Sequence, residues 1–245
     1  MRGLLDAVAF LTRVPVPVDH ARRPDLARAA AWFPVVGAVL GAVLVGLAVA
    51  LSGPASVLVA VVLVVVVETV VTGALHLDGL ADVADGAGGT DREARLRIMK
   101  DHATGVYGTA AVVLALALEV ALLVDLVPGR GWVDAAALGA AAWSLSRAAM
   151  LPVALLLPYA RAEGTGRGVV EGLAVRHTAA GWVVPLALCA ALGWTGMAML
   201  AGALAASAGV GWLAHRWLGG ATGDVLGATA QVALLAALLG ASVVP

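Results

Sequence analysis

The feature that most constrains this chain is a series of long apolar runs, each about as long as a helix that crosses a lipid bilayer. Such a helix needs roughly 20 mostly apolar residues to cover about 30 Å of hydrocarbon. Seven runs bounded by charged residues, Gly or Pro can be drawn: 33–52, 55–75, 106–127, 135–157, 179–194, 197–213 and 225–244. The fifth and sixth are short and are separated only by a turn, so we expect six to eight spans.

The composition agrees with a membrane protein. The 245-residue chain is 62% hydrophobic and 13% charged, whereas a soluble domain carries about 25% charged residues. This charge is too low to cover a water-facing surface, which excludes a soluble globular enzyme. Abundant Ala, Val and Leu, with 30 Gly, suit helices that pack closely in lipid. We therefore predict an all-α, polytopic helical bundle that forms one membrane-embedded domain over residues 1–245.

Other classes of function are excluded by charge and by cysteine content. The net charge of -1 leaves no basic stripe to neutralise a run of phosphates, so we expect no nucleic-acid partner. The one cysteine, Cys189, lies inside an apolar run and can form neither an internal disulfide nor a thiolate metal site.

The positions of Lys and Arg predict the orientation, because short cytoplasmic loops retain positive charge. With a cytoplasmic N-terminus, thirteen of the 15 basic residues lie on the cytoplasmic side, and only Arg130 (outside) and Arg147 (within a span) do not. This topology makes 1–32 a cytoplasmic amphipathic segment. It also places the polar segments 76–105, 158–178 and 215–224 on the same face. We therefore expect the chemistry to face the cytoplasm.

The densest cluster of ionisable residues directly follows the second run. Asp78, Asp82 and Asp85 are spaced i, i+4 and i+7, which places them on one face of a helix. Because three adjacent carboxylates repel one another, a hard cation such as Mg²⁺, bound with phosphate oxygens and water, is a natural occupant. The alternative is a solvated acidic helix face. Gly79 and Gly86 favour the binding site, since glycine lets a ligand approach the backbone.

Several other polar residues are candidates for the same site. His76 is a ligand, a general base or only the residue that ends the span. The segment 91–102 alternates in charge and predicts either a solvated helix or cations for a phosphate-rich substrate; within it Lys100 and Asp101 are the better candidates. The Gly-rich islands 159–166 and 219–224 are each compatible with a phosphate loop or with a simple turn.

Three ionisable residues lie within the predicted spans: Glu68, Glu119 and Arg147. Charges in a membrane are costly, so each suggests a functional site. In one interpretation Arg147 pairs with Glu119 or Glu68 and fixes the helix packing. In the other, Arg147 faces an aqueous cleft and reaches a substrate phosphate.

Taken together, the polar segments of this chain resemble those of the cobalamin synthases, also called adenosylcobinamide-GDP ribazoletransferases. The matching segments run in family order over nearly the whole chain: FLTRVPVP at 10–17, FP at 33–34, TGALHLDGLADVADG at 72–86, IMKD at 98–101, SR at 146–147, YARAEGTG at 159–166 and GGATGDVLGA at 219–228. The segment 72–86 is long and specific. The chain departs from the family pattern on the last helix, where Gln231 and Leu234 occupy positions at which the family commonly has glutamates, and Glu68 is not part of that pattern.

The resemblance implies a Mg²⁺-dependent phosphodiester exchange in a bacterial or archaeal cell membrane. A hydroxyl of α-ribazole, or of its 5′-phosphate, attacks the phosphorus attached to adenosylcobinamide in adenosylcobinamide-GDP and expels GMP. The catalytic residues would be His76, Asp78, Asp82, Lys100 and Arg147, and the metal ligands Asp78, Asp82 and Asp85. Substrate binding would fall to Arg13, Asp101, Arg161, Glu163, Gly223 and Asp224. A homo-oligomer or a complex with other cobalamin-assembly enzymes stays open.

The sequence also allows two other functions. A CDP-alcohol phosphotransferase also uses spaced aspartates and Mg²⁺, but its motif requires an Arg that the Asp78–Asp82 segment lacks. A cation transporter would use Glu68, Glu119 and Arg147 as its path, which predicts carboxylates at mid-membrane and a plain cytoplasmic face. The acidic cluster instead follows a span.

Overall fold

The computed structural model describes residues 2–17, 24–164 and 166–244, and over these ranges it is helical with one isolated bridge between Tyr159 and Ala221. Arg22, Arg23 and Thr165, which belong to the basic N-terminal segment and to a Gly-rich island, lie outside the described residues. The helices, in chain order, are α1 (Arg2–Leu11), α2 (Leu26–Ala30), α3 (Phe33–Leu51), α4 (Val57–Thr72), α5 (Leu75–Gly86), α6 (Arg92–Ile98), α7 (Val106–Leu126), α8 (Trp132–Leu156), α9 (Arg167–Val170), α10 (Val175–Ala191), α11 (Gly193–Leu218) and α12 (Gly223–Ser242). The predicted all-α class is confirmed.

Five helices of the described chain are long and apolar enough to cross a membrane: α3, α7, α8, α11 and α12. The count is six if α4 and α5 form one broken span, and α10 is a shorter apolar helix of 17 residues. These helices correspond to the seven predicted runs. The chain is therefore a polytopic helical membrane protein.

The second predicted span is shorter in the structure than the sequence indicates. We expected it to continue to residue 75, but α4 ends at Thr72 and α5 leaves it at an angle of 87°. Gly73 (φ 61°) and Ala74 (φ 57°) form the bend, and both have left-handed backbone conformations. A left-handed alanine is uncommon and costs free energy, so the surrounding packing must hold this turn. The bend directs α5 away from the α4 axis and across α12.

The core of the bundle is α8, which α3 and α12 cover. Gly37 and Gly41 of α3 lie against Trp143 and Gly139 of α8, so closely that a Cβ on either of these α3 glycines would collide with the α8 backbone. This small-residue spacing is the one that lets membrane helices approach. The ring of Trp143 is fully buried there.

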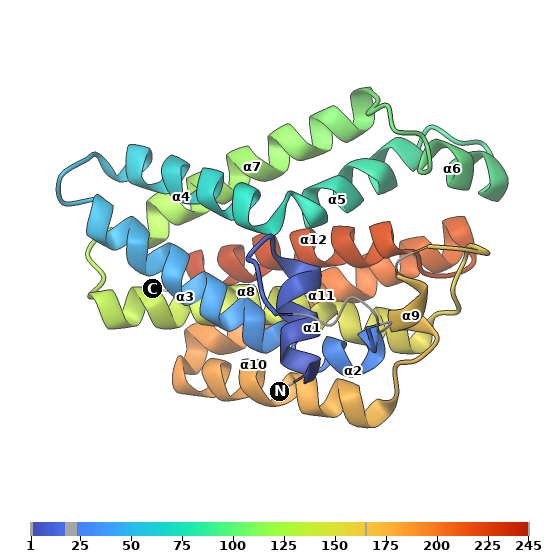
Figure 1. Ribbon diagram of the computed structural model, residues 1–245. Helices are drawn as coiled ribbons and strands as arrows, with labels where there is room; N and C mark the ends of the chain where they lie inside the picture. The colour runs from blue at the N-terminus through green and yellow to red at the C-terminus, as the bar shows by residue number, and fades with distance from the viewer. Residues whose placement is uncertain (1, 18–23, 165, 245) are drawn as a thin grey trace.

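The polar segments gather at one end of the bundle. Figure 1 shows α6 and α9 at this end, whereas the loop that joins α3 to α4 and the C-terminus lie at the other. The connections at the far end are short, since α3 and α4 are separated only by residues 52–56 and α7 and α8 only by 127–131. The predicted segregation of polar chemistry to one face therefore agrees with the fold.

Candidate active site

The site is built where α5 crosses α12. The crossing depends on two glycines, because a Cβ on Gly79 would lie 2.7 Å from the carbonyl oxygen of Asp224 and 3.0 Å from the Cα of Gly227. We predicted that Gly79 and Gly86 let a ligand approach the backbone, and this stays a prediction, with Gly79 lining the cavity described below. Both glycines also serve the packing of the helices. Gly79 makes room for α12, and a Cβ on Gly86 would lie 3.0 Å from Cγ of Met99.

This crossing brings the acidic face of α5 to the N-terminus of α12. Asp224, 142 residues beyond Asp82 in the chain, pairs with Arg161, whose Nη1 lies 2.8 Å from Oδ2 of Asp224. Burial, together with the carboxylates of Asp224 and Asp78, raises the pKa of Asp82 to about 7. A raised pKa in a group of like charges marks a candidate functional site.

A cavity of about 120 Å³ opens beside these residues. Its polar and glycine lining comes from α5, from α12 and from the Gly-rich segment before α9, and comprises His76, Asp78, Gly79, Gly166, Gly223, Asp224 and Gly227. Phe10 and Met150 add an apolar wall. Its volume suits a phosphate group with a metal ion and water, and the bare glycine backbone lets such a group approach closely.

Asp85 forms hydrogen bonds to the protein backbone. Its carboxylate accepts hydrogen bonds from the backbone N–H of Gly105 at 2.7 Å and of Gly108 at 2.8 Å. These groups belong to the unpaired N–H groups at the start of α7, and a carboxylate stabilises such a helix end. The role of Asp85 as a metal ligand stays a prediction.

Among the described residues, no three His, Cys, Asp or Glu side chains are already arranged to hold a metal ion. Carboxylate oxygens are nonetheless the ligands that Mg²⁺ uses. This ion commonly binds only one or two protein carboxylates and completes its coordination with phosphate oxygens and water. The Asp78 and Asp82 carboxylates on one face of α5, next to Asp224, fit that pattern.

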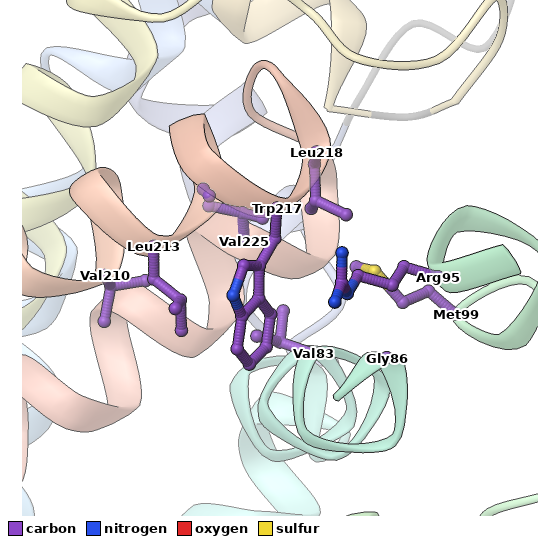
Figure 2. Close-up of a pocket in the computed structure, with 10 residues that line it drawn as sticks. Val83, Gly86, Arg95, Met99, Val210, Leu213, Trp217, Leu218 and Val225 are labelled. Carbon is purple, nitrogen blue, oxygen red and sulfur yellow. The ribbon is translucent and has the colours of Figure 1, made fainter. Parts of the chain in front are cut away.

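The arginines of α6 support the structure. Arg92 donates from Nε to the carbonyl oxygen of Leu218 at 2.7 Å and from Nη2 to that of Ala160 at 2.9 Å. The guanidinium of Arg95 lies 5.1 Å from the ring centroid of Trp217 on α11. Figure 2 shows Arg95 reaching from α6 toward α11, above Gly86 of α5. These contacts fasten α6 to the bundle.

Not all of the predicted substrate-binding residues come together. Gly223 and Asp224 line the cavity and Arg161 contacts Asp224. Lys100, Asp101 and Glu163 are exposed and do not line it, and Arg13 lies at the α4–α5 bend, where its Cζ would be 3.0 Å from a Cβ on Gly73. Gly227, which also lines the cavity, was not among the predicted site residues, although it lies within the family motif at 219–228.

The intramembrane charges form a closed network next to the site. Arg147 is 2% exposed, its Nη2 lies 3.9 Å from Oε1 of Glu68, and the same oxygen accepts a hydrogen bond from Nε1 of Trp143 at 2.6 Å. Gln231 donates to Oε2 of Glu119 at 3.0 Å. The pairing of Arg147 with Glu68 agrees with the first of the two interpretations. Arg147 does not line the cavity.

Comparison with known proteins adds a family match. A family model described as cobalamin-5-phosphate synthase matches residues 3–242. A protein named adenosylcobinamide-GDP ribazoletransferase from Chlorobium phaeobacteroides (strain BS1) is 38% identical over 240 residues, 94% of this chain and 93% of the relative. Proteins of the same name are 37% identical in Pseudomonas aeruginosa, over 98% of this chain and 97% of the relative, and 41% identical in Azorhizobium caulinodans, over 96% and 92%. No solved structure gives a significant match.

Proposed function

Because the chain belongs to the cobalamin-5-phosphate synthase family, we propose that it catalyses the reaction for which its relatives are named, the transfer of ribazole to adenosylcobinamide-GDP. The hydroxyl oxygen of α-ribazole, or of its 5′-phosphate, forms a bond to the phosphorus attached to adenosylcobinamide. The bond from that phosphorus to GMP breaks, and the hydroxyl loses its proton. The products are adenosylcobalamin, or its 5′-phosphate, and GMP, which makes this the final assembly step of cobalamin.

The observation that supports this function best is the meeting of the α5 carboxylates with Asp224 and Arg161 beside the cavity. Displacement at phosphorus requires stabilisation of negative charge on the transferred group and on the leaving phosphate. Arg161 offers a planar cation for phosphate oxygens. The aspartates offer oxygen ligands for a divalent cation and an acceptor for the hydroxyl proton.

We assign Mg²⁺ to Asp78 and Asp82, with substrate phosphate and water completing its coordination. When bound, the ion supplies Lewis-acid neutralisation of the diphosphate. Two carboxylates suffice for this ion. Burial is the main cause of the raised pKa of Asp82, and a bound cation would offset the repulsion from Asp224 and Asp78 that adds to it. Asp224 holds Arg161 in place by their ion pair.

The polar end of the bundle is assigned to the cytoplasm. Support comes from the distribution of Lys and Arg in the sequence, because basic residues are retained in cytoplasmic loops. The cavity is small, so most of a nucleotide-activated corrinoid would lie outside it, while its diphosphate enters the part that α5 and α12 line.

The two alternative functions are not favoured. The relatives are named for ribazole transfer and not for CDP-alcohol chemistry or transport. The charges that a cation path would need are paired within the protein, as Arg147 with Glu68 and Glu119 with Gln231.

Reconstitution tests the proposal. Detergent-purified protein is incubated with adenosylcobinamide-GDP, α-ribazole and Mg²⁺, and the nucleotide products are separated by chromatography. We expect GMP to appear only when both substrates are present. Release of CMP from a CDP-alcohol, with no GMP from adenosylcobinamide-GDP, would instead support a CDP-alcohol phosphotransferase.

A further inference from the structure

His76 occupies an unusual place, in the first turn of α5 directly after the α4–α5 bend. It is 4% exposed and borders two cavities. One is the candidate site, shared with Asp78 and Asp224. The other lies deeper and is lined by Glu68 and Glu119. The imidazole therefore forms the wall between the site and the buried charge network.

The two ring nitrogens of His76 have different surroundings. Nδ1 lies 3.4 Å from Nη2 of Arg147. Nε2 is buried, and no group of the described residues forms a hydrogen bond with it. A buried polar atom without a partner is costly and calls for an explanation. Because His76 lines the site cavity, a ligand in that cavity is the partner that we consider for Nε2.

The chemistry of arginine fixes the tautomer. A guanidinium has only donors, so the nitrogen that faces Arg147 must present a lone pair. A neutral imidazole with a bare Nδ1 carries its proton on Nε2. An Nε2 that carries the proton can donate a hydrogen bond, but it cannot coordinate a metal ion or remove a proton from a hydroxyl.

Arg147 is held firmly enough to impose this choice. Its Nη1 donates to Oγ of Ser146 at 3.1 Å, and Glu68, itself bound to Trp143, balances its charge from 3.9 Å. Its Cδ would lie 3.2 Å from a Cβ on Gly37, so α3 closes the remaining side. Arg147 does not line the site cavity, and His76 is the lining residue that it contacts.

We propose that Arg147 is a positioning residue that fixes His76 with its proton on Nε2, so that His76 donates a hydrogen bond to a phosphate oxygen of the bound substrate. This inference rests on the proposed function for the identity of the acceptor, but the tautomer itself does not depend on it. His76 is thereby removed from the candidates for general base and for metal ligand. The hydroxyl proton is left to an aspartate of α5.

The first test reads the tautomer without any substrate. Protein labelled with ¹⁵N-histidine is studied by long-range ¹H–¹⁵N NMR in detergent, and the His76 signal is assigned as the one missing in His76→Gln. We expect the ¹⁵N chemical shifts of His76 to be those of an unprotonated Nδ1 and a protonated Nε2. This pattern should be retained in Arg147→Lys and lost in Arg147→Met. A proton on Nδ1 of the wild-type protein, or an unchanged spectrum in Arg147→Met, would overturn the proposal. If Arg147→Met does not fold, the wild-type and Arg147→Lys spectra still decide.

The second test separates a donor from a base. The side-chain amide of His76→Gln can supply an N–H near the position of Nε2 but cannot act as a base, whereas His76→Ala supplies neither. We expect His76→Gln to keep GMP release within about tenfold of wild type and His76→Ala to lose about 100-fold, as for removal of one donor to a developing charge. Equal, large losses in two variants that elute as monodisperse protein would contradict the donor role. Absence of GMP release in the wild type would instead count against the proposed function and leave the NMR result intact.

Discussion

The carboxylate of Asp85, the last residue of the acidic face of α5, accepts a hydrogen bond from the backbone N–H of Gly105, 20 residues further along the chain, at 2.7 Å. A second bond comes from Gly108. The two glycines leave no space for a side chain, because a Cβ on Gly105 would lie 2.6 Å from Oδ1 of Asp85. Of the three aspartates on this face of α5, Asp85 is the one that ties α5 to the start of α7.

Asp85→Asn therefore tests an anchoring role. An amide has one acceptor oxygen, so one of the two backbone N–H groups loses its partner, which we expect to cost about 1–3 kcal/mol. The melting temperature should fall while the affinity for Mg²⁺ stays within about twofold of wild type. Asp91→Asn, which changes the cap of α6, is the matched control and should have the smaller effect. A loss of Mg²⁺ binding at an unchanged melting temperature would assign Asp85 to the metal.

Gly79→Ala tests the helix crossing. The added methyl group would meet the carbonyl oxygen of Asp224 at 2.7 Å, and overpacking of this kind typically costs about 1–3 kcal/mol. We expect Gly79→Ala to have a lower melting temperature than wild type and to lose activity, since Asp224 and Arg161 would move away from α5. Gly209→Ala on α11 is the control, because no described residue outside the adjacent turns of its own helix lies within 4 Å of its Cβ position. Equal effects of the two substitutions would show that the close crossing is not required.

The raised pKa of Asp82 gives a pH dependence with a definite sign. In the metal-free protein the carboxyl binds its proton more tightly when folded, with a pKa of about 7 against 3.8. Its contribution to stability is therefore present below pH 4 and is lost as the pH rises through 7. We expect the wild-type melting temperature to fall more between pH 6 and pH 8 than that of Asp82→Asn. Identical pH dependence in the two proteins would mean that Asp82 does not titrate in this range.

The same group should make metal binding depend on pH. Because a carboxylate must be ionised to bind Mg²⁺, the affinity should rise with pH up to about 7 and then level off. Calorimetric titration at pH 6 and at pH 8 measures this change. Asp78→Asn removes one of the repelling carboxylates and is expected to shift the rise to lower pH while weakening the binding.

Arg161 is expected to act on substrate binding. Its Nη1 lies 2.8 Å from Asp224, with both side chains about one-fifth exposed, so the guanidinium is held next to the cavity. Arg161→Gln should raise KM for adenosylcobinamide-GDP about tenfold or more, and Arg161→Lys should recover part of this loss, because lysine keeps the charge but not the planar pair of donors. An unchanged KM in Arg161→Gln would remove Arg161 from the site.

The spans could be predicted because their signal is local. The run 33–52 became α3 and 106–127 became α7, each within one residue, since continuous apolar residues suffice to define a membrane helix. The sixth run was drawn at 197–213, but α11 extends from Gly193 to Leu218. The run was bounded by the turn at 193–196 and by His215 and Arg216, but these residues are also helical in α11.

The site was only partly predictable because its main contacts are not local. The spacing of Asp78 and Asp82 on one helix face could be read directly, but the meeting with Asp224 requires α5 to cross α12. That crossing follows from a left-handed alanine at 74, which no propensity favours, and from the contact between Gly79 and Gly227. The partner of Arg147 could not be predicted for the same reason, since the sequence does not distinguish Glu68 from Glu119. The structure pairs Arg147 with Glu68.

The central claim, that the α5 carboxylates carry a ribazole transfer, is tested most directly by measuring both products in one reaction. Wild type, Asp82→Asn and Asp85→Asn, each monodisperse in detergent, are supplied with Mg²⁺, adenosylcobinamide-GDP and α-ribazole, and GMP and cobalamin are quantified together. We expect equal amounts of GMP and cobalamin in wild type, at least about 100-fold less of both in Asp82→Asn, and substantial turnover in Asp85→Asn. Normal yields of both products in folded Asp82→Asn would contradict the central claim.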